Sequence, residues 1–201
     1  MSELINNYGD GILVRNVRIY DLEESIRAAK YPKATEIGEG MPTSALTDGI
    51  KKLAVTPIGE GHDNWLTGIR IAFDLTATIK MWTEAERYHF FDIVSSQSTM
   101  HKITEFDLDK AYCEYVDPRM VGIMKELVAE YNENPTPAKY LQILYSNPTG
   151  MKLTARVTTN YRQLKTIYKQ RFTHRLPEWR AFCAWIEELP QHGLITGGGV
   201  L

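Results

Sequence analysis

Apolar and polar residues alternate in two segments of the chain, which is the pattern of a strand with one buried face. The first segment, Ile12 to Tyr20, is rich in β-branched side chains, which favour strands. In the second segment Ile69, Ile71, Phe73 and Leu75 fall on one face. We therefore predict a half-buried strand over the first segment and a core strand over the second.

Helical spacing of apolar residues predicts further elements along the chain. The predicted helical segments cover residues 21–31, 46–55, 76–89, 107–132, 138–144 and 159–172. Asp21 is the expected N-cap of the first, and Pro118 is expected to interrupt the fourth, because proline disfavours helix in the residue before it. Residues 35–44, rich in Gly and Pro, predict a mobile loop, and Ser95 to His101 predict an irregular turn.

The length and composition indicate a single globular domain. The 201 residues, of which 43% are hydrophobic and 24% charged, are enough to bury a substantial core. No internal repeat and no shift in composition marks a linker, so we expect one domain over residues 1–201. The glycine-rich tail, residues 193–201, is expected to be flexible.

Charge and cysteine content narrow the classes of function. With 23 basic and 25 acidic residues the formal net charge is -2, which argues against a nucleic-acid binder and favours a small-molecule site. Cys113 and Cys183 stand in apolar or aromatic surroundings, so we expect neither a disulfide scaffold nor a metal site. With no leader and no long uncharged run, the chain is expected to be cytoplasmic, with no membrane partner.

The segment Thr158 to Trp179 carries the most distinctive combination of residues. A helix from about residue 159 to 172 brings Asn160 and Arg171 to nearly the same side, because eleven residues make about three turns. A polar amide and a permanent cation then line one stripe, and His174 follows in the sequence THRLPEW. The alternative is a plain amphipathic helix.

Two further clusters place polar residues next to structural breaks. GHDNW contains His62 and Asn64, which are candidates for a binding site. The alternative is that they are a loop histidine and a turn former without a function. EAERYHFF contains Glu84, Arg87 and His89, which are also candidates. The alternative is that they form the solvated end of a helix.

A fourth cluster, SSQSTMHK, contains Ser95, Ser98 and Thr99. Small hydroxyl side chains and the exposed backbone N–H groups of a turn can together hold a phosphate. This cluster is therefore a candidate for the phosphate of a nucleotide.

In their order and spacing, these clusters resemble the flavin-dependent thymidylate synthases. The C-terminal segment is similar to the family's N-x-R-S-L...L-R...H-x-x-W-E region, with matches at Asn160, Arg162, Leu164, Arg171, His174 and Trp179. GHDNW is similar to a G-H segment that precedes an F-x-F strand, and EAERYHFF to the R-H-R signature. Ser98 matches a serine that contacts the nucleotide, and the similarity extends from about Ile12 to Leu189.

The resemblance implies a fold, a reaction and an assembly. The fold would be α+β, an antiparallel sheet packed with helices, in a homotetramer whose sites are shared between subunits. The reaction would be FAD-dependent C5 methylation, or a related C5 modification, of a pyrimidine nucleotide such as dUMP or an analogue. NADPH and methylenetetrahydrofolate would be co-substrates, and no protein nucleophile is needed because the flavin carries the redox step.

The resemblance also assigns roles to individual residues. Arg171 would act catalytically, by polarising the pyrimidine. The residues implied for FAD are His62, Asn64, Arg87, His89, Ser95, Asn160 and His174. Those implied for the nucleotide are Glu84, Arg87, Ser98, Thr99 and Arg171. We further expect Arg171 and Ser98 to meet across a subunit interface.

Several departures from the family pattern leave a second interpretation open. Thr67-Gly68 replaces an E-H pair, Pro32 stands where a flavin-contacting serine is found, and Met100 stands in place of an arginine. A further substrate arginine of the family falls near Leu141 or Gln142. The alternative is a non-catalytic nucleotide-binding or interaction protein that keeps the scaffold and has lost flavin chemistry. The many Lys, Asn, Ile and Tyr residues suggest a phage or low-GC bacterial source.

Overall fold

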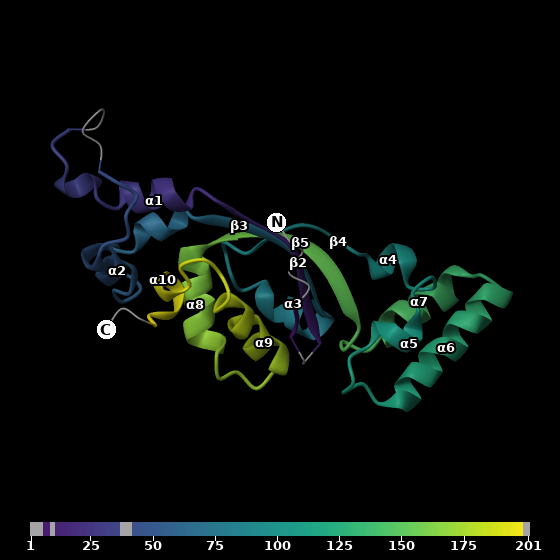
Figure 1. Ribbon diagram of the computed structural model, residues 1–201. Helices are drawn as coiled ribbons and strands as arrows, with labels where there is room; N and C mark the ends of the chain where they lie inside the picture. The colour runs from purple at the N-terminus through teal and green to yellow at the C-terminus, as the bar shows by residue number, and fades with distance from the viewer. Residues whose placement is uncertain (1–5, 9–10, 37–41, 199–201) are drawn as a thin grey trace.

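A twisted antiparallel sheet forms the middle of the molecule in the computed structural model, which describes residues 6–8, 11–36 and 42–198 (Figure 1). The strand order in this sheet is β1-β2-β3-β5-β4. The strands are β1 (Asn6–Tyr8), β2 (Ile12–Tyr20), β3 (Arg70–Thr78), β4 (Asp92–Ser96) and β5 (Lys152–Asn160). The expectation of an α+β fold with an antiparallel sheet is confirmed.

Helices α3, α8 and α9 lie against one face of the sheet, and α5 to α7 form a separate helical lobe beside it (Figure 1). The α-helices are α1 (Leu22–Ala28), α2 (Asp48–Ala54), α3 (Ile79–Ala85), α4 (Thr99–Lys102), α5 (Leu108–Ala111), α6 (Pro118–Glu133), α7 (Pro137–Ser146), α8 (Tyr161–Arg171), α9 (Pro177–Ile186) and α10 (Gly193–Thr196). The 3-10 helices are η1 (Tyr31–Lys33) and η2 (Asn64–Thr67). Among the described residues, no helix is both long and apolar enough to cross a membrane.

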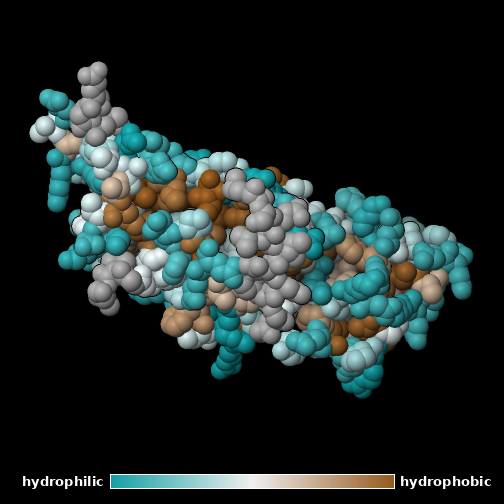
Figure 2. Space-filling view, in the orientation of Figure 1, coloured by the Kyte–Doolittle hydropathy of each residue, from teal (hydrophilic) through white to brown (hydrophobic). Residues whose placement is uncertain are grey.

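Two hydrophobic cores stabilise the chain. The larger lies between the sheet and helices α8 and α9, where the ring of Phe73 contacts those of Phe182 and Trp185. The smaller belongs to the helical lobe and is centred on Met124 and Ile143. Figure 2 shows hydrophobic residues surrounded by hydrophilic ones over both parts. The molecule thus has a sheet part and a helical part, each with its own core.

The predicted strands are found at their expected places because their alternation matches the burial of the sheet. β2 has the predicted bounds, and Ile71, Phe73 and Leu75 of β3 point into the larger core. The opposite face of the sheet is polar, with an ion pair between Asp74 and Arg156 at 3.0 Å. A hydrophobic face against helices and a polar outer face are typical of antiparallel sheets.

Strands β4 and β5 were not predicted, and both change the placement of site residues. The expected helix over 159–172 begins only at Tyr161, because Asn160 is the last residue of β5 and pairs with Arg70. Asn160 instead caps α8, accepting a hydrogen bond from Gln163 N at 2.9 Å. Asn160 therefore lies outside α8, of which Arg171 is the last residue, so the two do not belong to one helix as predicted.

Three smaller expectations also differ from the structure. The helix expected from Thr76 begins at Ile79, because Thr78 ends β3 and caps α3 through Met81 N. The segment expected to be an irregular turn contributes Ser95 to β4 and Thr99 to α4. Asp21 makes no side-chain cap, because its own backbone is left-handed, with φ of 63°.

The tail and the glycine-rich loop are described only in part. Gly193–Thr196 form α10, and Leu194 and Ile195 are buried in the larger core, so this stretch is not the free tail expected. Residues 199–201 lie outside the described residues, as do residues 37–41 of the loop expected to be mobile.

A close approach of two segments makes Gly150 sensitive to substitution. An added Cβ would meet Val116 Cγ2 at 2.2 Å and Cys113 Sγ at 3.1 Å. We expect Gly150→Ala to lower the free energy of unfolding by about 1–3 kcal/mol, through overpacking. Gly122→Ala is the matched control, because nothing lies within 4 Å of its Cβ position. In the interior of α6 that change should stabilise by about 0.5–1 kcal/mol. Urea denaturation of both variants measures these changes in the free energy of unfolding. An unchanged value for Gly150→Ala would contradict the close packing of Gly150 against Val116.

Candidate functional site

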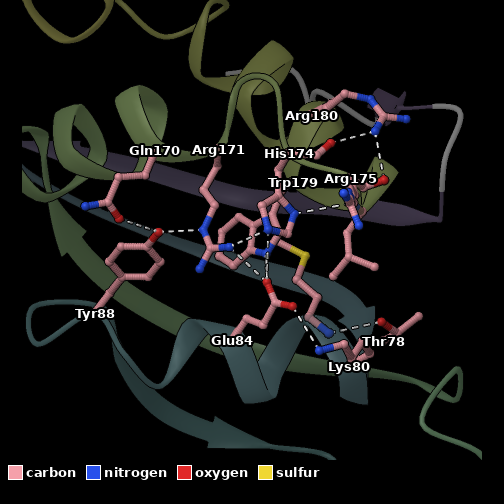
Figure 3. A network of polar contacts seen from close by, with 12 residues as sticks. Thr78, Lys80, Glu84, Tyr88, Gln170, Arg171, His174, Arg175, Trp179 and Arg180 are labelled. Atoms are coloured by element: carbon pink, nitrogen blue, oxygen red, sulfur yellow. Dashed lines mark hydrogen bonds and ion pairs between the residues drawn. The ribbon is translucent and has the colours of Figure 1, made fainter.

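Hydrogen-bond donors from α3, α8 and α9 converge on the carboxylate of Glu84 (Figure 3). Arg171 Nη1 donates to Glu84 Oε2 at 2.9 Å and Trp179 Nε1 donates to the same oxygen at 3.0 Å. Lys80 Nζ donates to Glu84 Oε1 at 2.9 Å. Both carboxylate oxygens thus have donors, Oε1 from within α3 and Oε2 from residues far along the chain.

The guanidinium group of Arg171 is held on several sides. Its Nε donates to Tyr88 Oη at 2.6 Å, and its central carbon lies 4.7 Å from the centre of the Trp179 ring. Arg171 is only 8% exposed, and the Glu84 carboxylate balances its charge. Its remaining nitrogen, Nη2, makes no hydrogen bond to the described residues, so one donor is left for a ligand.

His174 lies partly buried beside the Arg171 guanidinium, which disfavours a second positive charge. Arg171 Nη1 is 2.8 Å from Nε2 of the ring, and Leu176 N donates to Nδ1 at 3.2 Å. Burial and then the positive charge of Arg171 lower the pKa of His174 below its ordinary value. The ring is therefore neutral at neutral pH and adds no second cation to the site.

Glu84 stays ionised in the same surroundings. Burial raises the pKa of Glu84, but hydrogen bonds from Lys80 and Trp179 and the charges of Lys80 and Arg171 together outweigh it. The net pKa of Glu84 lies below its ordinary value. The centre is thus a charge-balanced pair of carboxylate and guanidinium with a neutral imidazole beside it.

A second buried ion cluster fixes the loop that carries His62. Asp63 is fully buried, and its carboxylate accepts from Lys165 Nζ at 2.7 Å and from Arg162 Nε at 3.1 Å. Lys165 Nζ also donates to the carbonyl oxygens of Ala54 and Thr56, at 2.7 and 2.6 Å. Helix α8 therefore positions both the end of α2 and the His62 loop.

A cavity of about 780 Å³ opens beside this loop and is lined in part by His62, Asn64 and Trp65. Its volume is within the range of small-molecule sites. Nε1 of Trp65 is buried without a hydrogen-bond partner among the described residues, which is uncommon for an indole. Asn64 accepts from Arg162 Nη1 at 3.2 Å, and Lys30 on the same wall donates to the carbonyl oxygens of Thr43 and Ala45.

A second cavity, of about 740 Å³, lies on the other side of η2 and includes Asn160. Arg70, Phe90 and Asp92 also line it. Because η2 contributes Asn64 to one cavity and Thr67 to the other, the two form neighbouring recesses along η2.

The structure brings some of the predicted site residues together and leaves others apart. Glu84, Arg171 and His174 form one network, and His62 and Asn64 line one cavity. Asn160 lines the second cavity. The remaining predicted residues are Arg87, His89, Ser95, Ser98 and Thr99, which lie at the surface or only half-buried. No contact among the described residues joins Ser98 to Arg171, so a single chain does not assemble one site from all of them.

Three partners in these networks were not singled out from the sequence. Lys80 lies four residues before Glu84, on the same side of α3, whereas Tyr88 follows the end of α3 and accepts from Arg171. Asp63 lies between His62 and Asn64 and is the buried member of that motif. The pairing of Lys80 with Glu84 can be predicted from their spacing in a helix, whereas the burial of Asp63 depends on its contacts with α8.

Comparison with solved structures shows what the arrangement as a whole resembles. No family model matches the chain, and no curated protein matches its sequence. The flavin-dependent thymidylate synthase ThyX of Helicobacter pylori, solved with FAD and dUMP, superposes with a TM-score of 0.69. The match covers 92% of this chain and 99% of that one, at 14% identity. The chain has the fold of a flavin-dependent thymidylate synthase.

A second neighbour with this thymidylate synthase fold is the UMP/dUMP methylase PolB of Streptomyces cacaoi, solved with 5-Br dUMP. It superposes with a TM-score of 0.64 over 96% of this chain and 97% of its own, at 16% identity. Both neighbours are covered almost completely, so the helical lobe belongs to the shared fold as much as the sheet does. At these identities the likeness concerns the fold alone.

The buried Asp63 cluster gives a test of how firmly the His62 loop is held. Asp63→Asn leaves the Lys165 ammonium buried without a counter-charge, so we expect a loss of about 3–5 kcal/mol in the free energy of unfolding. Asp74→Asn is the matched control, because its pair with Arg156 is partly exposed, at 26% and 32% of the two side chains. There we expect under about 1 kcal/mol. Equal losses in urea denaturation would contradict the proposed difference.

Proposed function

We propose that the protein binds a pyrimidine nucleotide such as dUMP and modifies C5 of its base with FAD. The observation that supports this most strongly is the fixed Arg171 guanidinium, with one donor unused, on a fold whose solved neighbours hold dUMP or an analogue. A preorganised cation is the group that C5 chemistry needs, because negative charge develops on the pyrimidine carbonyl when C5 becomes nucleophilic.

The charge balance at Arg171 favours contact with the base over contact with the phosphate. Glu84 already neutralises the guanidinium, so a dianionic phosphate would meet a carboxylate at close range. A neutral carbonyl oxygen of the pyrimidine can accept from Nη2 without this repulsion. The phosphate is then left to Ser98 and Thr99, at the start of α4.

The cavity beside His62 fits part of a flavin. Its apolar and aromatic lining suits a planar ring system, and Asn64, His62 and the unpartnered Trp65 Nε1 supply polar contacts. Asn160 would contribute from the neighbouring cavity, on the other side of η2. When bound, FAD supplies hydride transfer, with NADPH as reductant and methylenetetrahydrofolate as one-carbon donor. The protein's own part is to orient the nucleotide and exclude water.

A site of this kind requires more than one chain, and we propose a homotetramer. Ser98 and Arg171 belong to different parts of the molecule, and no described contact joins them. The edge strand β4 supports assembly, because Ile93 and Val94 are 44% and 61% exposed on an unpaired edge. Exposed apolar side chains on a free edge are usually covered by a partner.

The second candidate is a nucleotide-binding or interaction protein that no longer uses flavin. It is supported by Lys30, which lines the cavity beside His62. The Lys30 ammonium donates to the carbonyl oxygens of Thr43 and Ala45, so these donors are not available to a cofactor. Pro32 on the same wall offers neither a hydroxyl nor a backbone N–H. These residues remove cofactor contacts without disturbing the scaffold.

Bound flavin separates the two candidates. We expect purified protein incubated with excess FAD and then desalted to retain visible absorbance at a stoichiometric level. We expect His62→Ala to lower FAD affinity about tenfold, because a polar contact to the cofactor is lost. His101→Ala is the matched control, since His101 is exposed on α4 and lines neither cavity beside η2. Colourless protein that still binds dUMP by calorimetry would favour the second candidate instead.

A further inference from the structure

A cavity of about 620 Å³ lies at the junction of the sheet part and the helical lobe. One wall is the start of α9, and the other is formed by the segment between α5 and α6 and by the Pro148–Gly150 turn. None of the residues assigned above to the nucleotide or to FAD lines it. Any ligand it holds is therefore additional to the proposed reaction.

The body of this junction cavity is apolar. Val116 and Met120 face it from the helical lobe, and Leu176 and Pro177 face it from the start of α9, with Pro148 from the turn. Met120 is 39% exposed and belongs to neither hydrophobic core, so its side chain is available to a ligand. Such a lining suits a small apolar or aromatic group.

Positive charge gathers at the rim without acidic partners of its own. Arg175 makes no ion pair and no side-chain hydrogen bond among the described residues. Arg180 uses only Nη1, which donates to the carbonyl oxygens of His174 and Arg175 at 2.7 and 3.0 Å. Figure 3 shows Arg180 bound to these two carbonyl oxygens. Arg175 and Arg180 both line the cavity, and Lys80 reaches it while it pairs with Glu84.

The acidic residues that line the junction cavity make their hydrogen bonds to groups other than the two arginines. The Asp117 carboxylate accepts from Nε and Nη2 of Arg119, as a two-pronged pair. Glu178 is buried and accepts from the backbone N and the hydroxyl of Thr78. Neither carboxylate pairs with Arg175 or Arg180, so both guanidinium groups at this cavity lack an acidic partner among the described residues. An anion at the cavity could pair with them.

The start of α9 adds to the positive electrostatic potential at the junction cavity. This ten-residue helix begins at Pro177, and no side chain caps its N-terminus. The free N–H groups and the dipole of a helix start favour negative charge nearby. The uncapped helix start and the two open guanidinium groups thus act at one cavity.

We propose that the junction cavity binds a small organic anion. Its phosphate or carboxylate head lies between Arg175 and Arg180, where a guanidinium fork matches two oxygens. Its apolar body lies against Val116, Met120 and Leu176. The inference does not depend on flavin or on dUMP, because it uses no residue of the proposed reaction.

Three probes of one size separate the contributions of head and body. Phenyl phosphate and phenylacetate carry the two anionic heads, and benzyl alcohol carries the same ring without charge. We would titrate each into the full chain and follow backbone amide signals by NMR. We expect both anions to shift the amides of Leu176, Glu178 and Gly150, with Kd values below about 10 mM. The ratio of the two Kd values identifies the preferred head group.

The deciding variant is Arg175→Glu. The Arg175 side chain makes no ion pair and no hydrogen bond among the described residues, so we expect the fold to stay intact. We expect it to weaken both anions at least about tenfold and to leave benzyl alcohol unchanged. Arg18→Glu is the matched control, because Arg18 is exposed on β2 and, among the described residues, its side chain donates only to the neighbouring Val17 carbonyl.

Three results would overturn the proposal. The first is absence of shifts at the cavity with either anion. The second is equal weakening by the two charge reversals, which would indicate a general effect of net charge. The third is binding of benzyl alcohol as tight as that of the anions, which would show that the arginines contribute nothing.

Discussion

The carboxylate of Glu84 is the interaction on which the C-terminal half of the structure depends. It accepts from Arg171 at the end of α8, from Trp179 in α9 and from Lys80 in its own helix. Burying a guanidinium and an indole N–H side by side is costly unless an acceptor satisfies both. Glu84 therefore fixes the orientation of Arg171, and it also limits what Arg171 can bind, because the charge is already balanced.

Helix α8 connects this centre with the His62 loop. Arg162 and Lys165 near its start hold Asp63, and Arg171 at its end holds Glu84. Both contacts join buried or nearly buried charges, so neither tolerates loss of one partner. The neighbouring recesses along η2 and the Arg171 centre thus keep a fixed relation, which is what a two-ligand site needs. The remaining elements, β4 and α4, present Ser98 and Thr99 at the surface.

The features that could be predicted from the sequence are those that depend on a local pattern of residues. β2 and the core of β3 were predictable because strict alternation produces one buried face, and the break before Pro118 was predictable from proline sterics. β5 was missed because its last residues, Thr159 and Asn160, also suit the start of the following helix, and only pairing with β3 shows that they belong to a strand. The contacts of Asp63 with Lys165 and of Glu84 with Arg171 join residues far apart in the chain, so no spacing rule reveals them.

The central claim is that one nucleotide site takes Ser98 from one chain and Arg171 from another. The most direct measurement is dUMP binding, by calorimetry, to Ser98→Glu chains, to Arg171→Ala chains and to the two co-assembled in equal amounts. We predict that neither variant binds alone and that about a quarter of the sites bind in the mixture, since some sites then draw both native residues. No recovery in the co-assembled protein, or undiminished binding by either variant alone, would contradict the shared site.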